Sequence, residues 1–521
     1  MKKLYSLFIL ICVSTTLVFS QTPDWSTSVA KIFYDNCTNC HHDGGIAPFS
    51  LIEYAPAVDN ALNIQSFVNA KKMPPWPADP NYTHFKDEQV LSDYEINTIN
   101  DWVNNGTPPG DFSLAPIPPV YNGLAVMVNP DDTIFLPHFP LGTDSDVHRT
   151  FVMHSGYTEA KYLNQIEFVP GAPSVDHHAI FYRDTTDVSY QADLAEPGPG
   201  FTGSAGGATN LIVFAGWNPG RAVISLPPFM GFRIPDSSDY VVAMHYVGGD
   251  GVTDSSYMNL KYCPVPVNQI RPIVADRLIN WNYPSLIDGP LLIPANTTKT
   301  FHAQSDTFSY SRSLIGFGPH SHLVAKTWIL VMISAEGDTT KLLSIPQWDF
   351  NWQMSYFLTK VIKVPPGSRY YATVTYDNTT NNPNNPSNPP KDVKAGTGTK
   401  DEMLAVTFWT MDYLEGDEDI IMDSAYYTPI DNVFDPASMP LKVFPNPSGE
   451  NFGFDTFLPE HNVIWMLTDE NGIVVKSAAE NNIAKGAYNQ QVSIKNLANG
   501  VYFLTLQSGN QKSVRKIVVA H

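Results

Sequence analysis

Cysteine is scarce in this chain, with 4 residues in a length of 521. Cys12 lies in the apolar N-terminal segment, which leaves Cys37, Cys40 and Cys263 in the rest of the chain. A small exported domain held by disulfides needs an even and larger set of cysteines. The sequence therefore excludes a disulfide framework, and its domains must be stabilised by core packing alone.

Charged residues are also few, at 16% of the chain, and they are unbalanced, with 31 Lys and Arg against 51 Asp and Glu. The resulting net charge of −20 repels nucleic acid and anionic membranes, so we expect neither as a partner. Aromatic residues reach 12%, and there are 43 Pro and 33 Gly. This composition is typical of short strands joined by turns, and the length predicts several domains.

The N-terminal segment has the features of a targeting signal. Lys2 and Lys3 precede an apolar run over residues 4–19, and Ser20 before Gln21 fits the small-residue rule for cleavage. The run is short for a stable membrane span, and polar sequence follows it. We expect residues 1–20 to be removed during export through the periplasm; an uncleaved anchor is the alternative.

Cys37 and Cys40 belong to a Cys-Thr-Asn-Cys-His sequence that ends at His41. In this C-x-x-C-H pattern, two thiols add to the vinyl groups of a haem and the histidine supplies an axial nitrogen. A redox dithiol would not need the histidine, and a zinc site would need further ligands. The motif therefore predicts a covalently attached haem c.

Met73 is the expected second axial ligand of this haem, because a thioether opposite an imidazole raises the haem potential. His42 and His84 are competing ligands, and a core methionine before a proline turn is the structural alternative. We rank both histidines below Met73.

Two amphipathic helices are expected around the haem motif, over residues 26–34 and 92–104. The second begins at the N-cap Ser92, with Glu95 at the capping-box position, and ends at Asn105-Gly106. With the haem motif, these features resemble the cytochrome c family over about residues 24–110. A proline-rich stretch then predicts a stiff linker.

Histidines accumulate in the β-rich middle of the chain. His320 and His322 lie two residues apart in a strand-like run, so both rings can reach one metal ion; partly buried structural histidines are the alternative. His177 and His178 are adjacent, and neighbouring residues of a regular strand face opposite ways. This pair can serve one metal only at a strand end or a local twist. His245 follows in a further apolar run.

Met403 adds a thioether, which suits Cu(I) better than zinc, calcium or magnesium. Together these motifs resemble the copper type II, ascorbate-dependent monooxygenases, the peptidylglycine α-hydroxylating and dopamine β-hydroxylating enzymes, over about 300 residues. The resemblance implies two copper ions, each in its own β-sandwich, that face each other across a solvent-filled cleft. It assigns an electron-transfer copper to His177, His178 and His245, and the copper that binds O2 to His320, His322 and Met403.

This sequence departs from that family at two points that bear on its substrate and its electron supply. Gly318 stands where the peptidylglycine enzymes have an arginine that binds the substrate carboxylate, which argues against a peptidylglycine substrate. Those enzymes also draw electrons from outside, whereas this chain has its own haem motif. The Asn- and Pro-rich residues 377–390 predict a long surface loop that leads to Met403; a flexible linker is the alternative.

The tail from Leu441 onward contains alternating strand patterns, turn residues and a basic end at residues 512–516. These features predict a small β-sandwich. The tail resembles the C-terminal sorting domain of the type IX secretion system, which implies a secreted or cell-surface protein and the type IX machinery as a partner. An ordinary binding sandwich is the alternative.

The expected fold is mainly β and multidomain, with a small α-helical cytochrome c domain, two jelly-roll-like β-sandwich copper domains and a small C-terminal β-sandwich. The expected boundaries are a signal peptide at 1–20, the haem domain at 21–112, a linker at 113–125, the two copper sandwiches at 126–273 and 274–425, a linker at 426–440 and the sorting domain at 441–521.

The expected function is that of an exported copper-dependent monooxygenase that hydroxylates a C–H bond of a small organic or peptide substrate with O2. An external donor would supply electrons through the haem. Two alternatives from other classes stay open. One is a copper and haem electron-transfer protein without oxygenase activity. The other is a cell-surface adhesion or carbohydrate-binding protein with structural histidines.

Overall fold

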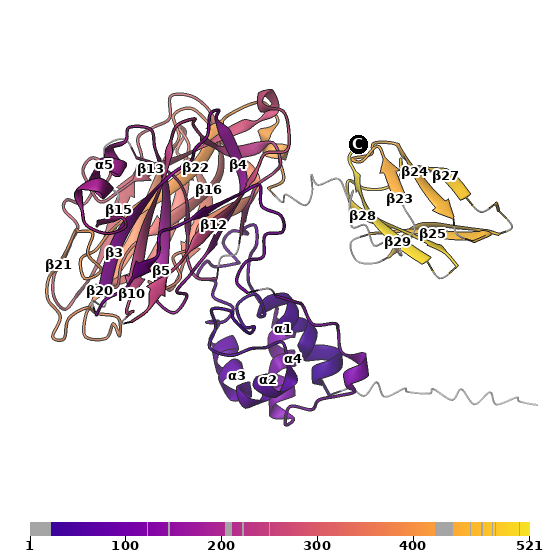
Figure 1. Ribbon diagram of the computed structural model, residues 1–521, viewed down its shortest axis with the longest axis horizontal. Coiled ribbons are helices and arrows are strands. Elements are labelled where there is room, and N and C mark those ends of the chain that lie inside the picture. The colour runs from indigo at the N-terminus through magenta and orange to yellow at the C-terminus, as the bar shows by residue number, and fades with distance from the viewer. Residues whose placement is uncertain are drawn as a thin grey trace, which may run out of the picture. The chain divides into compact units, whose positions relative to one another are not determined.

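The computed structural model describes residues 22–121, 123–143, 146–203, 211–220, 223–249, 251–422, 441–458, 460–469, 473–481, 483–484, 486–509 and 511–521. The signal peptide expected at 1–20 and the linker expected at 426–440 lie outside the described residues. The described residues form two compact units, one on each side of residue 426 (Figure 1). The chain is mainly β, as its composition predicts, and its longer helices gather near the N-terminus.

The N-terminal helices pack around buried aromatic side chains (indigo in Figure 1). The ring of Trp25 lies 5.8 Å from that of Phe33 and 6.2 Å from that of Trp102. These contacts fix the ends of the helical segment against each other. The helices are η1 Trp25–Val29, α1 Ala30–Asn36, α2 Tyr54–Asp59, α3 Ala61–Asn69, α4 Asp93–Asn104 and the 3-10 turn η2 Phe112–Leu114.

Helix α4 begins as the sequence predicts. The Ser92 hydroxyl accepts the N–H of Glu95, and the Glu95 carboxylate accepts the N–H of Ser92, which completes the capping box. The helix expected at 26–34 is instead a π-helical turn followed by α1. The reason is that the Asp24 carbonyl accepts the N–H groups of both Ser28 and Val29, which widens the first turn.

A first β-sandwich combines a five-stranded sheet with one half of a nine-stranded sheet. The five-stranded sheet has the order β6-β3-β10-β5-β7, with strands β3 Asp146–His154, β5 Asp176–Asp184, β6 Phe201–Thr202, β7 Ile212–Trp217 and β10 Asp239–Val247. The half of the larger sheet contains β1 Asp132–Phe135, β4 Lys161–Val169, β8 Val223–Ser225, β9 Met230–Ile234 and β12 Tyr257–Tyr262. Smaller elements are β2 Phe139–Pro140, β11 Thr253–Asp254 and α5 Val188–Ala195.

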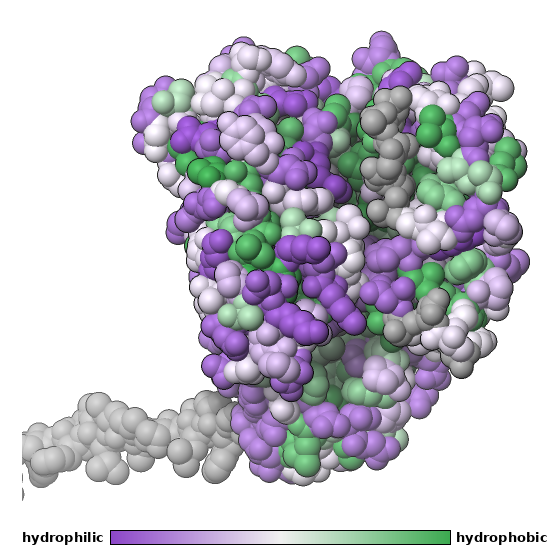
Figure 2. Space-filling view, turned by 90° about the vertical axis from the view of Figure 1, so that its left-hand side faces the viewer, coloured by the Kyte–Doolittle hydropathy of each residue, from purple (hydrophilic) through white to green (hydrophobic). Residues whose placement is uncertain are grey.

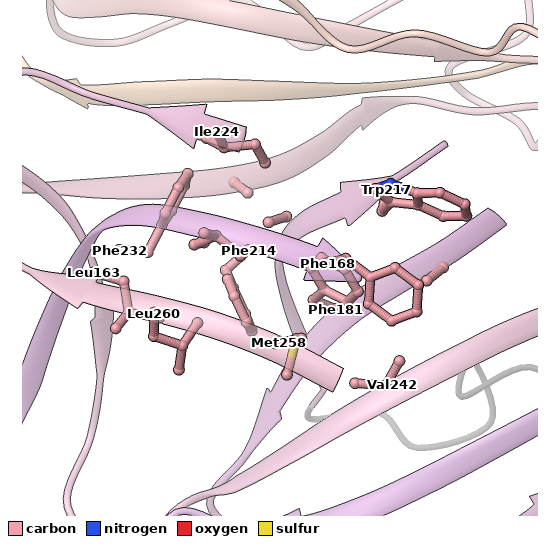
Figure 3. Packing of buried hydrophobic residues seen from close by; sticks show 14 of the residues in the cluster. Leu163, Phe168, Phe181, Phe214, Trp217, Ile224, Phe232, Val242, Met258 and Leu260 are labelled. Carbon is pink, nitrogen blue, oxygen red and sulfur yellow. The ribbon is translucent and has the colours of Figure 1, made fainter. Parts of the chain in front are cut away.

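Large side chains from both layers fill the core of this first sandwich (Figure 3). The Phe168 ring of β4 lies 5.6 Å from that of Phe181 on β5 and 5.0 Å from that of Trp217 on β7. Met258 and Leu260 alternate along β12, and neither is exposed to solvent. Side chains that alternate along the strands thus pack one face of each sheet into this core, and on the central strand β10 the opposite face is buried as well.

A second β-sandwich contains the other half of the nine-stranded sheet and a four-stranded sheet. The half sheet is formed by β13 Arg271–Ile279, β16 Arg312–His320, β19 Tyr356–Val364 and β22 Ala405–Asp412. The four-stranded sheet has the order β15-β20-β17-β18, with β15 Thr297–Gln304, β17 Ala325–Ile333, β18 Thr339–Ile345 and β20 Arg369–Asn378. Smaller elements are β14 Leu292–Ile293, β21 Val393–Lys394, η4 Val267–Gln269 and η5 Asp417–Asp419.

The two sandwiches are joined by parallel pairing of β9 with β13, which makes the nine-stranded sheet continuous. In this pairing, Arg271 lies opposite Met230 and Ile273 lies opposite Phe232. The indole N–H of Trp409 on β22 also donates to the Phe214 carbonyl of β7 at 2.9 Å. The second half of the large sheet is therefore held close to the five-stranded sheet.

The segment between α3 and α4 packs into the second sandwich. Ala78 and Phe85 belong to its buried core, and Phe85 forms an isolated antiparallel bridge with Leu358 of β19. The Trp76 ring lies 5.5 Å from that of Tyr356. Apolar side chains of this segment therefore complete the core of the second sandwich.

The Asn- and Pro-rich loop after β20 is held by side-chain hydrogen bonds. Asn378 is fully buried, and its amide donates to the carbonyls of Ile293 at 2.9 Å and Lys391 at 2.8 Å. Asn385 donates to the Asn378 side-chain oxygen at 2.8 Å. The segment is irregular as predicted, and these contacts tie its start to β14 and to its far end at Lys391.

The unit after residue 426 contains a three-stranded sheet, β23-β24-β27, and a four-stranded sheet, β26-β25-β28-β29. Its core includes Phe452, Phe454, Leu467 and Leu504. It is the small β-domain that the tail sequence predicts. The strands are β23 Leu441–Phe444, β24 Asn451–Leu458, β25 Asn462–Asp469, β26 Val474–Asn481, β27 Gly486–Ser493, β28 Gly500–Ser508 and β29 Gln511–Val519.

On the face shown in Figure 2, apolar residues are scattered among polar ones. None of the described helices is long and apolar enough to cross a membrane.

Candidate metal centre

Three histidines form a row across the three central strands of the five-stranded sheet. His245 on β10 lies directly opposite His148 on β3 and opposite His178 on β5. The register of β10 with β5 shifts after His245, so that Tyr246 pairs with Asp176 and His177 is the extra residue of a bulge. This is the local twist that adjacent histidines need in order to face one metal.

The imidazoles of this first set lie within reach of a single ion. Nδ1 of His177 is 3.1 Å from Nδ1 of His178, and one donor atom from each of His177, His178 and His245 lies within 4.8 Å of the others. Nε2 of His177 and Nδ1 of His245 are buried and have no hydrogen-bond partner. Unsatisfied buried nitrogens are costly, and a bound cation would satisfy them, so the residues fit a metal.

The second set lies where β16 ends. His320 is the last residue of β16 and His322 follows the strand, with ring centroids 5.2 Å apart and planes at 88°. Nδ1 of His322 lies 3.1 Å from the Asp401 carbonyl, and the Trp348 indole donates to the His322 carbonyl at 3.2 Å. His322 is therefore held by loop contacts rather than by a shared strand face.

A buried glutamate organises the backbone of the second set. Glu402 is fully buried and accepts the N–H groups of His322, of Met403 at 2.9 Å and of Val324 at 3.2 Å. Burial raises the pKa of Glu402 to about 8, although these donors favour the charged form. One side chain thus ties the segment after β16 to the segment that contains Met403.

Members of both sets, namely His178, His245, His320, His322 and Met403, line one cavity of about 370 Å³. The ring centroids of His178 and His320 are 6.3 Å apart, and Met403 lies in the same wall. The solvent-filled cleft expected between the two sites stays a prediction. The continuous sheet holds the two sandwiches close together around the shared cavity. The stacking of His177 on Phe350, with centroids 4.7 Å apart, is a further contact between them.

Burial keeps the imidazoles of the cavity neutral. It lowers the pKa of His178 and of His320 well below the ordinary value, and neighbouring imidazoles lower both further. It also lowers the pKa of His245 to about 4, with the repulsion of His148 and His177 as further causes. A neutral ring has a free lone pair, which is the form that binds metals.

A guanidinium also reaches the cavity. Arg277 on β13 pairs with Thr407 on β22, which pairs with Gly318 on β16, so the three positions share a row of the sheet. Arg277 lines the cavity, and its side chain forms a hydrogen bond with that of Tyr182. A Cβ at Gly318 would lie 3.2 Å from the Trp409 indole, so that ring fills the space above the glycine.

The haem motif follows α1 in a tight turn. Within it, the N–H of His41 donates to the Cys37 carbonyl at 3.0 Å. Burial raises the pKa of Cys37 to about 12 and that of Cys40 to about 11, so both are protonated thiols at neutral pH. Nδ1 of His41 bonds the Phe49 carbonyl at 3.0 Å, which orients the ring and leaves Nε2 for an axial position. These residues fit a covalent haem.

The alternative axial ligands are engaged elsewhere. His42 bonds the Thr38 carbonyl through Nδ1 at 2.7 Å and the Gly123 carbonyl through Nε2 at 3.2 Å. The His84 ring is 73% exposed and pairs with Glu88. Met73 lies in the wall of a separate cavity of about 730 Å³, with side chains from α3 and α4. Both ring nitrogens of His42 would have to give up partners before it could bind iron.

A third cavity lies between the helical segment and the sandwiches. Its volume is about 420 Å³, and Cys40 and Ile46 line one side of it. Trp217 and Met354 line both this cavity and the histidine cavity. The Cys40 side of the haem motif is therefore separated from the first histidine set by a wall that contains these two side chains.

Sequence reasoning missed several residues of the site, namely Asp146, His148, Arg277 and Glu402. Asp146 and His148 are two residues apart in a strand-like run, the same spacing that singled out His320 and His322. That spacing was an available signal. The positions of Arg277 and Glu402 depend on strand pairing and loop packing, for which the sequence has no local pattern.

The family model for the secretion-system C-terminal sorting domain matches residues 442–520. The tail is a sorting domain. The protein is therefore exported to the cell surface or beyond, and the tail interacts with the type IX secretion machinery. No curated protein matches the chain.

Some solved structures are similar to parts of the chain. One is a β-glucuronidase from Ruminococcus gnavus in complex with uronic isofagomine, at 11% identity over 43% of this chain and 36% of that chain, with a TM-score of 0.13. Another is apo β-glucuronidase 3 from Bacteroides uniformis, at 8% identity over 46% and 30%, with a TM-score of 0.13. The chain spans about a third of the length of these enzymes, and this likeness has no bearing on function.

The role of Glu402 predicts a measurable loss of stability. In Glu402→Gln, an amide N–H₂ replaces one acceptor oxygen, so at least one buried backbone N–H loses its partner at a cost of about 1–3 kcal/mol. Denaturant unfolding should show this decrease, and exchange of the His322 and Val324 amide protons should become faster. The control Glu336→Gln changes an exposed residue and should leave both unchanged. Equal stability of the two variants would contradict the role of Glu402.

Proposed function

We propose that this protein is an exported copper-dependent monooxygenase that hydroxylates a C–H bond of a small organic substrate with O2 and receives electrons through its own c-type haem. The observation that supports this most strongly is the meeting of two donor sets in one cavity. Four neutral imidazoles and one thioether of these sets, drawn from both sandwiches, line that cavity, and His177 lies beside His178 and His245. Such ligands suit copper, and the thioether favours Cu(I).

The two donor sets would have different roles. His177, His178 and His245 offer three nitrogens and suit an ion that cycles between Cu(I) and Cu(II). His320, His322 and Met403 include the soft ligand and would hold the copper at which O2 reacts. Copper bound in these sets would supply one-electron chemistry and activation of O2. One oxygen atom enters the substrate and the other leaves as water, so the external donor must provide two electrons.

The chain's own residues determine which substrate fits. A volume of about 370 Å³ lies at the small end of the range for ligand pockets. Trp281 and Trp409 provide apolar walls, and Gln353 lines the cavity with His320. Gly318 on β16 has no charge for a substrate carboxylate, but the guanidinium of Arg277, on β13, would be available to one. We infer a small, partly apolar substrate with an anionic group.

The haem would supply electrons from the side of the helical segment. Cys37 and Cys40 would attach it, and His41 and Met73 would be its axial ligands. The cavity at Cys40 shares the Trp217 and Met354 wall with the histidine cavity, which supports a short separation between donor and acceptor. The packing of Phe85 into the second sandwich holds the two parts in a fixed relation.

Incubation of reduced, copper-loaded protein with a library of small molecules under ¹⁸O₂ tests the proposal. Mass spectrometry should detect a product that is heavier by one ¹⁸O atom, with a matching consumption of O2. The variant His320→Ala, loaded in the same way, should give no labelled product. Reversible copper reduction without any labelled product would instead support an electron-transfer protein, and absence of bound copper would leave the histidines a structural role.

The two copper sets should respond differently to substitution. Met403→Ile keeps side-chain volume but removes the soft ligand, so Cu(I) affinity should fall by about 10- to 100-fold and oxygen chemistry should cease. His245→Ala should interrupt electron delivery while the other set still reacts. Single-turnover assays of pre-reduced protein should therefore give some product for His245→Ala and almost none for Met403→Ile. Wild-type rates and full copper loading in Met403→Ile would show that Met403 is not a ligand.

Covalent haem attachment should depend on the motif cysteines. Cys40→Ala or Cys37→Ala should abolish stable haem incorporation, as measured by absorption after denaturation, because the thioether bonds are lost. Cys263→Ala, the matched control, should keep its haem. Met73→Ala should retain the haem at a lower potential; an unchanged potential would assign the sixth position to another ligand. A wild-type protein without covalent haem would contradict the haem assignment itself.

Arg277 should set a preference for anionic ligands. Tryptophan fluorescence of the metal-free chain should show tighter binding of phenylacetate than of its uncharged amide. A charge-assisted hydrogen bond contributes about 1.5–3 kcal/mol, or about 10- to 100-fold. Arg277→Gln should remove this difference, whereas Arg233→Gln, an exposed arginine of β9, should keep it. Equal affinity of wild-type protein for both probes would contradict the anionic-substrate proposal.

A further inference from the structure

Asp146 and His148 lie beside the first histidine set and belong to neither predicted copper site. They are two residues apart on β3 and therefore share a face, and His148 lies directly opposite His245. The imidazoles of His148 and His245 are stacked, with centroids 4.2 Å apart and planes at 7°. Strand pairing thus places a carboxylate and a further imidazole next to His245.

The three donor atoms converge. Oδ1 of Asp146 is 2.8 Å from Nε2 of His245 and 3.6 Å from Nε2 of His148. One donor atom from each of the three residues lies within 4.8 Å of the others. Nε2 of His148 is buried and has no hydrogen-bond partner, so its lone pair or proton is directed into the cluster without being satisfied.

We propose that Asp146, His148 and His245 form a further metal site, which binds a divalent ion of the Zn²⁺ or Cu²⁺ class. Two imidazole nitrogens and one carboxylate oxygen are ligands of intermediate softness. Calcium and magnesium would need mainly oxygen ligands, and Cu(I) would prefer a thioether or thiolate to the carboxylate. An open coordination position would remain for water or for a group from the cavity.

This site shares the His245 ring with the first histidine set, but it uses Nε2 of that ring, whereas the first set uses Nδ1. Nε2 of His245 faces Asp146, whereas Nδ1 is buried without a partner and is available to the set with His177 and His178. Both positions can be filled when the ring gives its N–H proton to solvent and bridges the two ions as imidazolate. The proposal does not depend on oxygenase activity, since metal binding alone defines it.

The carboxylate also reaches the second sandwich. Asp146 accepts a hydrogen bond from Thr399, which lies in the loop before Met403 and lines the histidine cavity. An ion on Asp146 would therefore lie at the contact between the first histidine set and the loop that carries the soft ligand of the second set.

Equilibrium dialysis of the metal-free full-length protein against Zn²⁺, with elemental analysis, tests the site. We expect His148→Gln and Asp146→Asn each to weaken one class of bound Zn²⁺ by at least about 10-fold. His178→Gln disrupts only the three-histidine set and should retain this class. His154→Gln is the matched control, because His154 also lies on β3 and pairs with an aspartate, Asp239, at 2.5 Å but lies outside the cavity.

Two outcomes would overturn the proposal. One is Zn²⁺ binding in His148→Gln and Asp146→Asn that equals wild type, and the other is a wild-type protein that binds no Zn²⁺ sensitive to either substitution. Asp146→Asn is isosteric, and circular dichroism of both variants checks the fold. His148→Cys supplies a thiolate in place of the imidazole and should restore Zn²⁺ binding, which a purely structural role of His148 would not produce. Oxygenation assays are separate, so failure of the oxygenase proposal would leave these results interpretable.

Discussion

The parallel pairing of β9 with β13 is the contact on which the histidine cavity depends. It joins halves of two sandwiches into one nine-stranded sheet, so neither sandwich can rotate freely about the other. The Trp409 indole then bonds the Phe214 carbonyl and closes the second half of that sheet against β7. Because strand register is rigid, donors from distant parts of the sequence meet in one small cavity, and His178 lies 6.3 Å from His320.

The cavity combines features that lower stability with features that suit a metal. A bulge on β5 interrupts regular pairing, and buried imidazole nitrogens stay without partners. Local departures of this kind cost free energy and tend to occur at functional sites. Around them buried polar groups have hydrogen-bond partners, since Glu402 accepts several backbone N–H groups and Asn378 anchors the neighbouring loop. The scaffold is thus rigid where it positions ligands and unsatisfied where an ion would bind.

The helical segment is packed against the second sandwich. Ala78 and Phe85 complete the core of the second sandwich, and Trp76 packs on Tyr356. Apolar packing holds the segment that contains Cys40 next to the wall that contains Trp217. The histidine cavity lies on one side of that wall, and the cavity lined by Cys40 lies on the other.

Some properties of this protein follow from local sequence alone. The capping box at Ser92, the mainly β composition and the sorting tail each depend on residues close together in the chain, and the C-x-x-C-H motif is equally local. The shared cavity, the bulge that turns His177 toward His178, and the positions of His148, Arg277 and Glu402 depend on which strands pair and in what register. Those pairings join residues far apart in sequence, so only the tertiary structure decides them.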